Sequence, residues 1–105
     1  MKEIYIKAIA GKIKVRDWQV ENCAKLFEEG ATIPFVSRYR KERTGGLDEV
    51  AVAEVRHWTD VYAELEKRKT TILETIDQAG GLTPELRRKI EDSVESREVE
   101  DLYLP

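Results

Sequence analysis

Four basic side chains and one tyrosine lie close together between two segments of helical pattern. These residues are Arg38, Tyr39, Arg40, Lys41 and Arg43. Guanidinium and ammonium groups attract the phosphates of a nucleic-acid backbone, and a tyrosine ring can stack on a base, so the combination predicts contact with RNA or DNA. Arg40, Lys41 and Arg43 are the first candidates for the phosphates, and Tyr39 is the candidate for a base.

The same side chains could instead serve only the fold. Arg38 and Arg40 could form bidentate ion pairs with carboxylates of the long helix that follows or of further domains, and Glu42, Asp48 and Glu49 are close in the sequence. Phe35, Val36 and Tyr39 have helical spacing, so we expect them to bury one side of a short helix. Both interpretations are open at this point.

The excess of positive charge is local. The chain of 105 residues is 41% hydrophobic and 37% charged, which predicts one helix-rich domain with a modest core. Its net charge is −3, so the chain as a whole is not a polycation, whereas residues 37–43 carry four positive side chains and one negative. Composition therefore favours a local binding site over a general affinity for nucleic acid.

No combination of residues predicts catalysis, a metal site or a bound cofactor, so we expect no enzyme. The single histidine, His57, stands in the middle of a helical pattern and is expected at the surface or half-buried. The single cysteine, Cys23, follows an apolar stripe and is expected in the core, where it cannot form an internal disulfide. No stretch has the length of a membrane span or signal peptide, so we expect the cytoplasm.

The elements that must position the basic residues begin with a helical hairpin. Apolar spacing predicts a first helix from Glu3 to about residue 12 and a second from Asp17 to Glu29, ended by Gly30. This outline resembles a helix-turn-helix, but the motif is imperfect, because Lys14 stands where the turn usually has a glycine to adopt a positive φ. Acidic residues dominate the outward face of the second helix, which favours a structural hairpin over reading of a DNA groove.

A basic connector and a long helix are expected next. Pro34 can begin a short helix, and Thr44-Gly45-Gly46 is expected to form a sharp turn rather than a phosphate loop. Asp48 is the expected cap of a helix that reaches about residue 79 and would span about 50 Å. Its inner positions form a heptad-like seam with one polar break at Lys69: Val55, Trp58, Tyr62, Leu65, Lys69, Ile72, Ile76 and Ala79.

Two shorter helices are expected to close the chain. Thr83 followed by Pro84 is a strong helix start, with Thr83 as the cap. Ser96 is the expected cap of the last helix, which would present Val99 and Leu102.

The stretch from Gly30 to Glu49 also resembles a known family. It is similar to the N-terminal segment of the bacterial Tex proteins, which are transcription accessory factors. The shared residues form an almost continuous run: Gly30, Ala31, Ile33, Pro34, Phe35, Arg38, Tyr39, Arg40, Lys41, Glu42, Thr44, Gly45, Gly46, Leu47, Asp48 and Glu49. Weaker similarity at residues 19–21, 82–86 and 101–105 extends the resemblance over nearly the whole chain.

The resemblance implies that residues 1–105 are the N-terminal helical domain of a longer multidomain protein. In the Tex family an S1-type β-barrel further along carries most of the nucleic-acid binding, and a nuclease-like domain lacks a working active site. Neither lies in these residues. The implied partners are RNA or DNA, mainly through those other domains, and the transcription machinery.

The residues and the resemblance together predict an all-α fold: a helix-turn-helix-like hairpin, a basic connector, one long helix and two shorter C-terminal helices. The expected function is a helical scaffold in a nucleic-acid-binding transcription accessory protein, with an auxiliary contact through the connector. The alternative is a protein-interaction module without such contact. In that case the seam of the long helix would dock a partner, or a second copy to form a homodimer.

Overall fold

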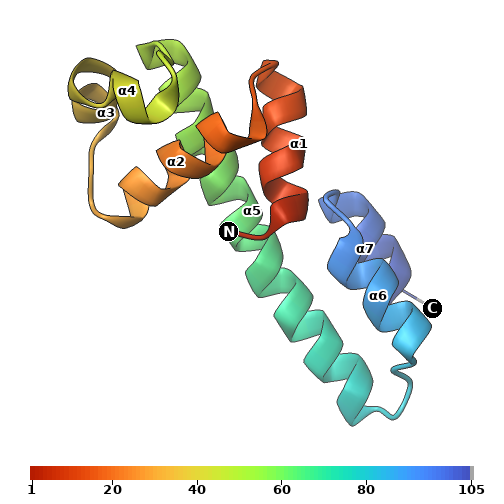
Figure 1. The fold of residues 1–105 in the computed structure, drawn as a ribbon. Helices are drawn as coiled ribbons and strands as arrows, with labels where there is room; N and C mark the ends of the chain where they lie inside the picture. Colours follow the sequence, from red (N-terminus) through yellow and green to blue (C-terminus); the bar gives the residue numbers. More distant parts are fainter. Residues whose placement is uncertain (105) are drawn as a thin grey trace. The chain divides into compact units, whose positions relative to one another are not determined.

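The structure is a computed structural model that describes residues 1–104. Within that range every regular element is an α-helix, which confirms the predicted fold class (Figure 1). The helices are α1 (Glu3–Ile13), α2 (Asp17–Glu28), α3 (Ile33–Tyr39), α4 (Lys41–Thr44), α5 (Glu49–Gln78), α6 (Pro84–Asp92) and α7 (Ser96–Tyr103). The chain divides into two compact units, and the boundary lies within α5, between Val61 and Tyr62.

The first unit opens with the predicted hairpin of α1 and α2. Lys14, just after α1, has a φ of 60°, which confirms that this turn position needs the left-handed conformation. Gly30 follows α2 with a φ of 93°, as the predicted helix stop requires. The buried side of α2 consists of Val20, Cys23, Ala24, Leu26 and Phe27.

The outward face of α2 is acidic, as the sequence indicates. Asp17, Glu21, Glu28 and Glu29 are exposed on it, and Lys25 is the one basic residue of α2. A net negative face opposes contact with phosphates. The hairpin therefore has the electrostatics of a structural element and not those of a helix that reads a DNA groove.

The long helix α5 has almost the predicted bounds. Asp48 caps it, since one carboxylate oxygen accepts the Ala51 backbone N–H at 2.8 Å. Several residues of the predicted seam are buried, including Val55 in the first unit and Tyr62, Leu65 and Ile72 in the second. The seam is therefore not the free apolar surface that the predicted homodimer through α5 would need.

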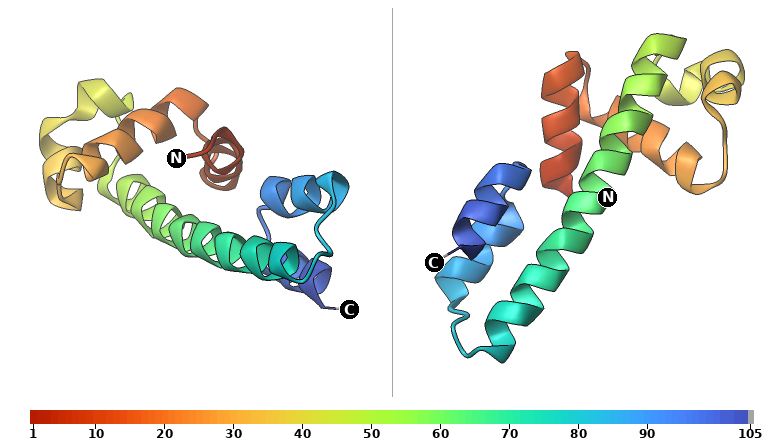
Figure 2. Two further views of the ribbon diagram at one scale, coloured as in Figure 1. Left: turned by 90° about the horizontal axis from the view of Figure 1, so that it is seen from below. Right: turned by 180° about the vertical axis from the view of Figure 1, so that it is seen from behind.

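The second unit is built around a buried lysine at the polar break of the seam. Lys69 is only 2% exposed, and its Nζ donates to the backbone carbonyls of Glu91 at 2.9 Å and Ser93 at 2.6 Å. These carbonyls lie where α6 ends, so the ammonium group compensates carbonyls that the helix leaves without partners. The helices α6 and α7 contact each other and lie side by side in Figure 2.

Of the two helix caps predicted in this unit, one is confirmed and the other is wrong. Thr83 caps α6 as predicted, because its Oγ1 accepts the Leu86 N–H at 3.1 Å. The prediction that Ser96 caps α7 is wrong, since Ser96 is the first helical residue and Glu95 precedes the helix. The buried Ser93 shapes the turn instead, because its Oγ accepts the Glu95 N–H at 3.2 Å.

Candidate nucleic-acid interface

The basic connector consists of the short helices α3 and α4, and α2 holds α4 in place. An isolated helix of four residues is not stable in water, so α4 depends on contacts from outside itself. The Gln19 amide donates to the carbonyls of Thr44 at 2.9 Å and Gly45 at 3.2 Å, and the Asn22 amide donates to the Arg43 carbonyl at 2.8 Å. These bonds satisfy the carbonyls at the end of α4. This role of Gln19 and Asn22 was not predicted from the sequence.

Gly45 is a glycine for two reasons. Its φ is 69°, in the left-handed region. In addition, a Cβ atom at this position would lie 2.6 Å from the Trp18 ring and 2.7 Å from Gln19 Nε2. The predicted sharp turn into α5 is confirmed, and α2 packs closely against its backbone.

Thr44 fixes the same turn from inside. Its side chain is fully buried, and its Oγ1 accepts the Leu47 N–H at 3.2 Å. Leu47 is buried as well, which anchors the chain just before α5. The loop between α4 and α5 is therefore ordered by side-chain contacts at both of its ends.

The exposed face of α3 carries two aromatic rings. Thr32 caps this helix through its Oγ1, which accepts the Phe35 N–H at 3.3 Å. The prediction that Phe35, Val36 and Tyr39 bury one side of α3 is wrong for both rings. Val36 is fully buried, whereas Phe35 is 38% and Tyr39 62% exposed. The two rings contact each other at a centroid distance of 5.5 Å, one turn apart along the helix.

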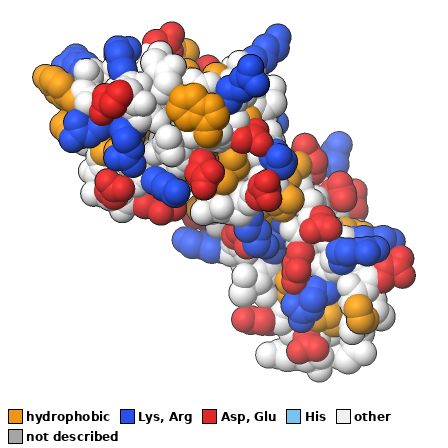
Figure 3. Space-filling model, in the orientation of Figure 1, with side chains coloured by type: hydrophobic (Ala, Val, Ile, Leu, Met, Phe, Trp, Pro, Cys, Tyr) orange, Lys and Arg blue, Asp and Glu red, His pale blue; other side chains and the backbone are white. Residues whose placement is uncertain are grey.

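The basic side chains lie around these rings without ion pairs. Within residues 1–104, no carboxylate forms an ion pair with any of the four basic residues, so the alternative that Arg38 and Arg40 pair with the long helix is not observed. Arg38 and Lys41 are exposed. Arg40 is half-buried, with its Nη1 donating to the Tyr39 carbonyl at 2.8 Å and its guanidinium carbon 4.7 Å from the centre of the Phe35 ring. Figure 3 shows basic side chains gathered around hydrophobic ones where α3 and α4 lie.

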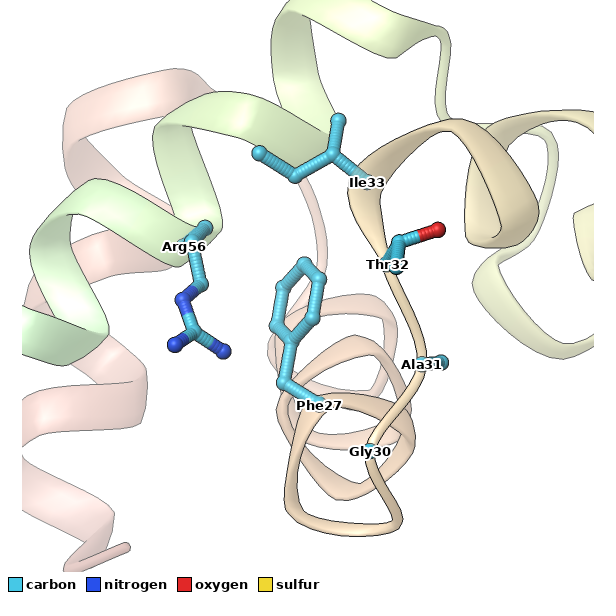
Figure 4. A pocket seen from close by; sticks show the side chains of 6 residues that line it. All are labelled: Phe27, Gly30, Ala31, Thr32, Ile33 and Arg56. Carbon is cyan, nitrogen blue, oxygen red and sulfur yellow. The ribbon is translucent and has the colours of Figure 1, made fainter.

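Two hollows lie against the link between α2 and α3. The first has a volume of about 370 Å³ and is lined by Phe27, Gly30, Ala31, Thr32, Ile33 and Arg56. In Figure 4 the Phe27 ring stands between Arg56 and the link, and the Arg56 guanidinium carbon lies 5.2 Å from the ring centre. The second has a volume of about 400 Å³ and is lined by Leu26, Glu29, Gly30, Ala31, Thr32, Phe35 and Arg40. An arginine and a phenylalanine therefore line each hollow.

The other titratable residues take no part in these hollows. Cys23 is fully buried, and burial raises the pKa of its thiol to about 12, so the thiol is neutral at physiological pH. His57 is exposed beside Trp58, with ring centroids 5.0 Å apart. Among residues 1–104, no three side chains of the metal-binding types are grouped to hold an ion, and no helix is long and apolar enough to span a membrane.

The sequence of this chain is similar to a known family of proteins. The model of the Tex-like protein N-terminal domain matches residues 3–77, which include α1 to α4 and nearly all of α5. This chain belongs to the Tex family. Its similarity covers 100% of the chain for Protein YhgF of Escherichia coli, at 41% identity, and 83% for Transcriptional accessory protein Tex of Neisseria gonorrhoeae, also at 41% identity.

A human relative extends the similarity beyond bacteria. The chain is 24% identical to S1 RNA-binding domain-containing protein 1 of Homo sapiens over 95% of its length. The chain spans 14% of the Escherichia coli relative, 12% of the Neisseria relative and 10% of the human relative. The chain therefore covers only a small part of the length of these relatives.

Proposed function

We propose that this domain is the helical scaffold of a Tex-like transcription accessory protein and that it contacts RNA or DNA through α3 and α4. The names of two relatives support this proposal, since one is a transcriptional accessory protein and another contains an S1 RNA-binding domain. Further domains of the whole protein would provide most of the binding, and the transcription machinery would be a partner. The protein would act in the cytoplasm.

The observation that carries the proposal is the unpaired state of the basic side chains. Arg38 and Lys41 are exposed without an ion pair to a carboxylate of residues 1–104, although 21 acidic residues are present in the chain. Phosphates can therefore approach them without displacing an internal partner. Tyr39, with 62% of its surface exposed, lies between them in sequence and offers a ring on which a base can stack.

A salt titration tests this proposal. Binding of short single- and double-stranded RNA and DNA would be measured by fluorescence anisotropy from about 50 to 200 mM salt. The dissociation constant should rise steeply with salt, because binding releases counterions from the phosphates. For single strands, the Arg38→Glu, Lys41→Glu double variant should lower the slope of log K against log salt by about 1.4, or about 0.7 for each lost contact.

A matched control carries the same change of charge at a different place. Arg88 and Arg97 are exposed residues of α6 and α7, so Arg88→Glu, Arg97→Glu alters the net charge equally without touching α3 or α4. It should bind nearly as the parent does. Equal weakening by both double variants would show that only net charge matters, and the assignment of the contact to α3 and α4 would then fail.

Docking of another protein remains the second candidate. The exposed Phe35 and Tyr39 rings favour it, because paired aromatic side chains are common in protein interfaces. Retention of a transcription protein by the parent but not by Tyr39→Ala, with no binding of oligonucleotides by either, would support this candidate over the first.

A further inference from the structure

The hollow between α2 and α3 combines three kinds of group on one surface. Its volume of about 400 Å³ lies in the range of about 300–1,000 Å³ that small-molecule sites occupy. Leu26 and Phe35 give it an apolar wall, Glu29 gives it a carboxylate, and Arg40 gives it a guanidinium group. Neither charged group forms an ion pair within residues 1–104.

The opposite charges decide what kind of ligand fits. A phosphate would be repelled by the Glu29 carboxylate, and a cation would be repelled by Arg40. A neutral planar group with hydrogen-bond donors on one edge and acceptors on another satisfies both charged groups and can contact the apolar wall. A nucleobase has these properties. The exposed Arg38, three residues after Phe35, and the exposed Lys41, next to Arg40 in the sequence, can bind the phosphates on either side of it.

Among the bases, guanine has the matching pattern of donors. Its N1–H and its amino group are adjacent donors that a carboxylate can accept together, whereas its O6 and N7 are acceptors that an arginine can bind. Uracil has a single donor between two acceptors, and adenine and cytosine each have an amino donor beside an acceptor. Only guanine therefore offers two adjacent donors to Glu29 and two adjacent acceptors to Arg40.

We propose that this hollow binds a guanine base of a single-stranded nucleic acid, with Glu29 and Arg40 as the specificity-determining residues. The inference rests on the proposed function, because a base reaches the hollow only when its phosphates bind α3 and α4. A base paired in a duplex uses the same edge for its partner strand, so the site selects unpaired nucleotides.

Heptanucleotides test this inference. Each would have three uridines, one variable nucleoside and three further uridines, with guanosine, adenosine, cytidine, uridine or inosine at the centre. The parent should bind the guanosine heptamer at least about fivefold more tightly than the other standard ones, since a bidentate contact discriminates by that factor or more. Inosine lacks the amino group, so the inosine heptamer should bind more weakly than the guanosine heptamer.

Two variants separate the base contact from general electrostatics. Glu29→Gln should reduce the ratio between the guanosine and uridine heptamers to about one. Glu28→Gln removes the neighbouring exposed carboxylate, which does not line the hollow, and should keep the ratio. Equal binding of all the heptamers by the parent, or an unchanged ratio in Glu29→Gln, would overturn the inference and leave the proposed function standing. Absence of binding to every heptamer and to the oligonucleotides of the salt titration would overturn both this inference and the proposed function.

Discussion

Single residues decide the shape of the turn that presents the basic connector. Gly45 combines a left-handed backbone, which is strained for most residues with a side chain, with a close approach of the Trp18 ring that leaves no room for a Cβ atom. A glycine without such demands occurs in α1. Gly11 is exposed within the helix, and a Cβ atom there would have no neighbour within 4 Å. The two glycines therefore form a natural pair for comparison.

We predict opposite effects of alanine at these two positions. Gly45→Ala should lower the free energy of unfolding by about 2 kcal/mol or more, because a left-handed alanine is strained and its methyl group would displace Trp18 or Gln19. Gly11→Ala should raise it by about 0.5–1 kcal/mol, since alanine favours the helix interior. Urea denaturation followed by circular dichroism measures both. Equal effects of the two substitutions would show that the turn does not constrain Gly45.

The buried thiol predicts a dependence of stability on pH. Burial raises the pKa of Cys23 from 9.0 to about 12, so the folded chain keeps a proton that the unfolded chain loses above pH 9. Its contribution is therefore complete below pH 9 and is lost as the pH rises towards 12. At pH 10 ionisation of this thiol in the unfolded chain should lower the free energy of unfolding by about 1.4 kcal/mol.

Cys23→Ala isolates this contribution. The variant should lose less stability than the parent between pH 8 and pH 10, although it is less stable at pH 8 because of the smaller core side chain. Tyr62, whose pKa burial also raises, is present in both proteins and cancels in the comparison. Identical losses in parent and variant would mean that the thiol ionises in the folded state as readily as in the unfolded one.

At the scale of elements, contacts between elements far apart in the sequence hold the short helices. Gln19 and Asn22 of α2 bind the last carbonyls of α4, and Lys69 of α5 binds the carbonyls at the end of α6. In both cases a polar side chain from a longer helix replaces the partners that a short helix lacks. The stability of the short helices therefore depends on these hydrogen bonds.

Replacing the buried lysine should weaken the second unit. Lys69→Met keeps the length of the side chain and leaves two backbone carbonyls without their donor, which should lower the free energy of unfolding by about 3 kcal/mol. Lys67→Met is the control, because Lys67 is 77% exposed and pairs only with Glu64, so it should change stability by less than about 0.5 kcal/mol. Thermal denaturation of both variants compares them. A Lys69→Met protein as stable as the parent would mean that the carbonyls find other donors.

The local signals of the sequence were sufficient for most of the elements. Proline, glycine and capping residues act within one turn of the chain, so the start of α6 and the stop after α2 could be predicted from Thr83 and Gly30. The side that a short helix buries depends on its neighbours. The exposure of Phe35 and Tyr39 could therefore not be predicted from their spacing, which fits a buried pair as well as an exposed one.

Some features of the candidate site left no local signal. An asparagine on a helix face is typical of solvent exposure, and only the fold shows that Asn22 binds the Arg43 carbonyl. Likewise, the lack of ion pairs around Arg38 and Lys41 depends on where every carboxylate lies. The five predicted site residues lie on α3, on α4 and, for Arg40, between these two helices. Their binding of nucleic acid stays a prediction.

On the scale of the whole molecule, the two units differ in what they offer to a polyanion. The first unit contains the basic connector with its exposed rings. In the second unit, Arg68 is engaged by Glu100 at 2.8 Å, and Arg87 and Lys89 pair with glutamates one turn away on α6. The exposed Arg88 and Arg97 of this unit lie on two different helices. We therefore expect the nucleic-acid contact in the first unit, at α3 and α4.

Mapping the contact by NMR tests this assignment most directly. The ¹⁵N-labelled chain would be titrated with the guanosine-centred heptanucleotide while amide chemical shifts are followed. We predict that the largest changes fall within residues 29–43, while the amides of α6 and α7 stay unchanged. Changes centred on the second unit or on residues 17–28, or no changes at high concentrations of the oligonucleotide, would contradict this assignment.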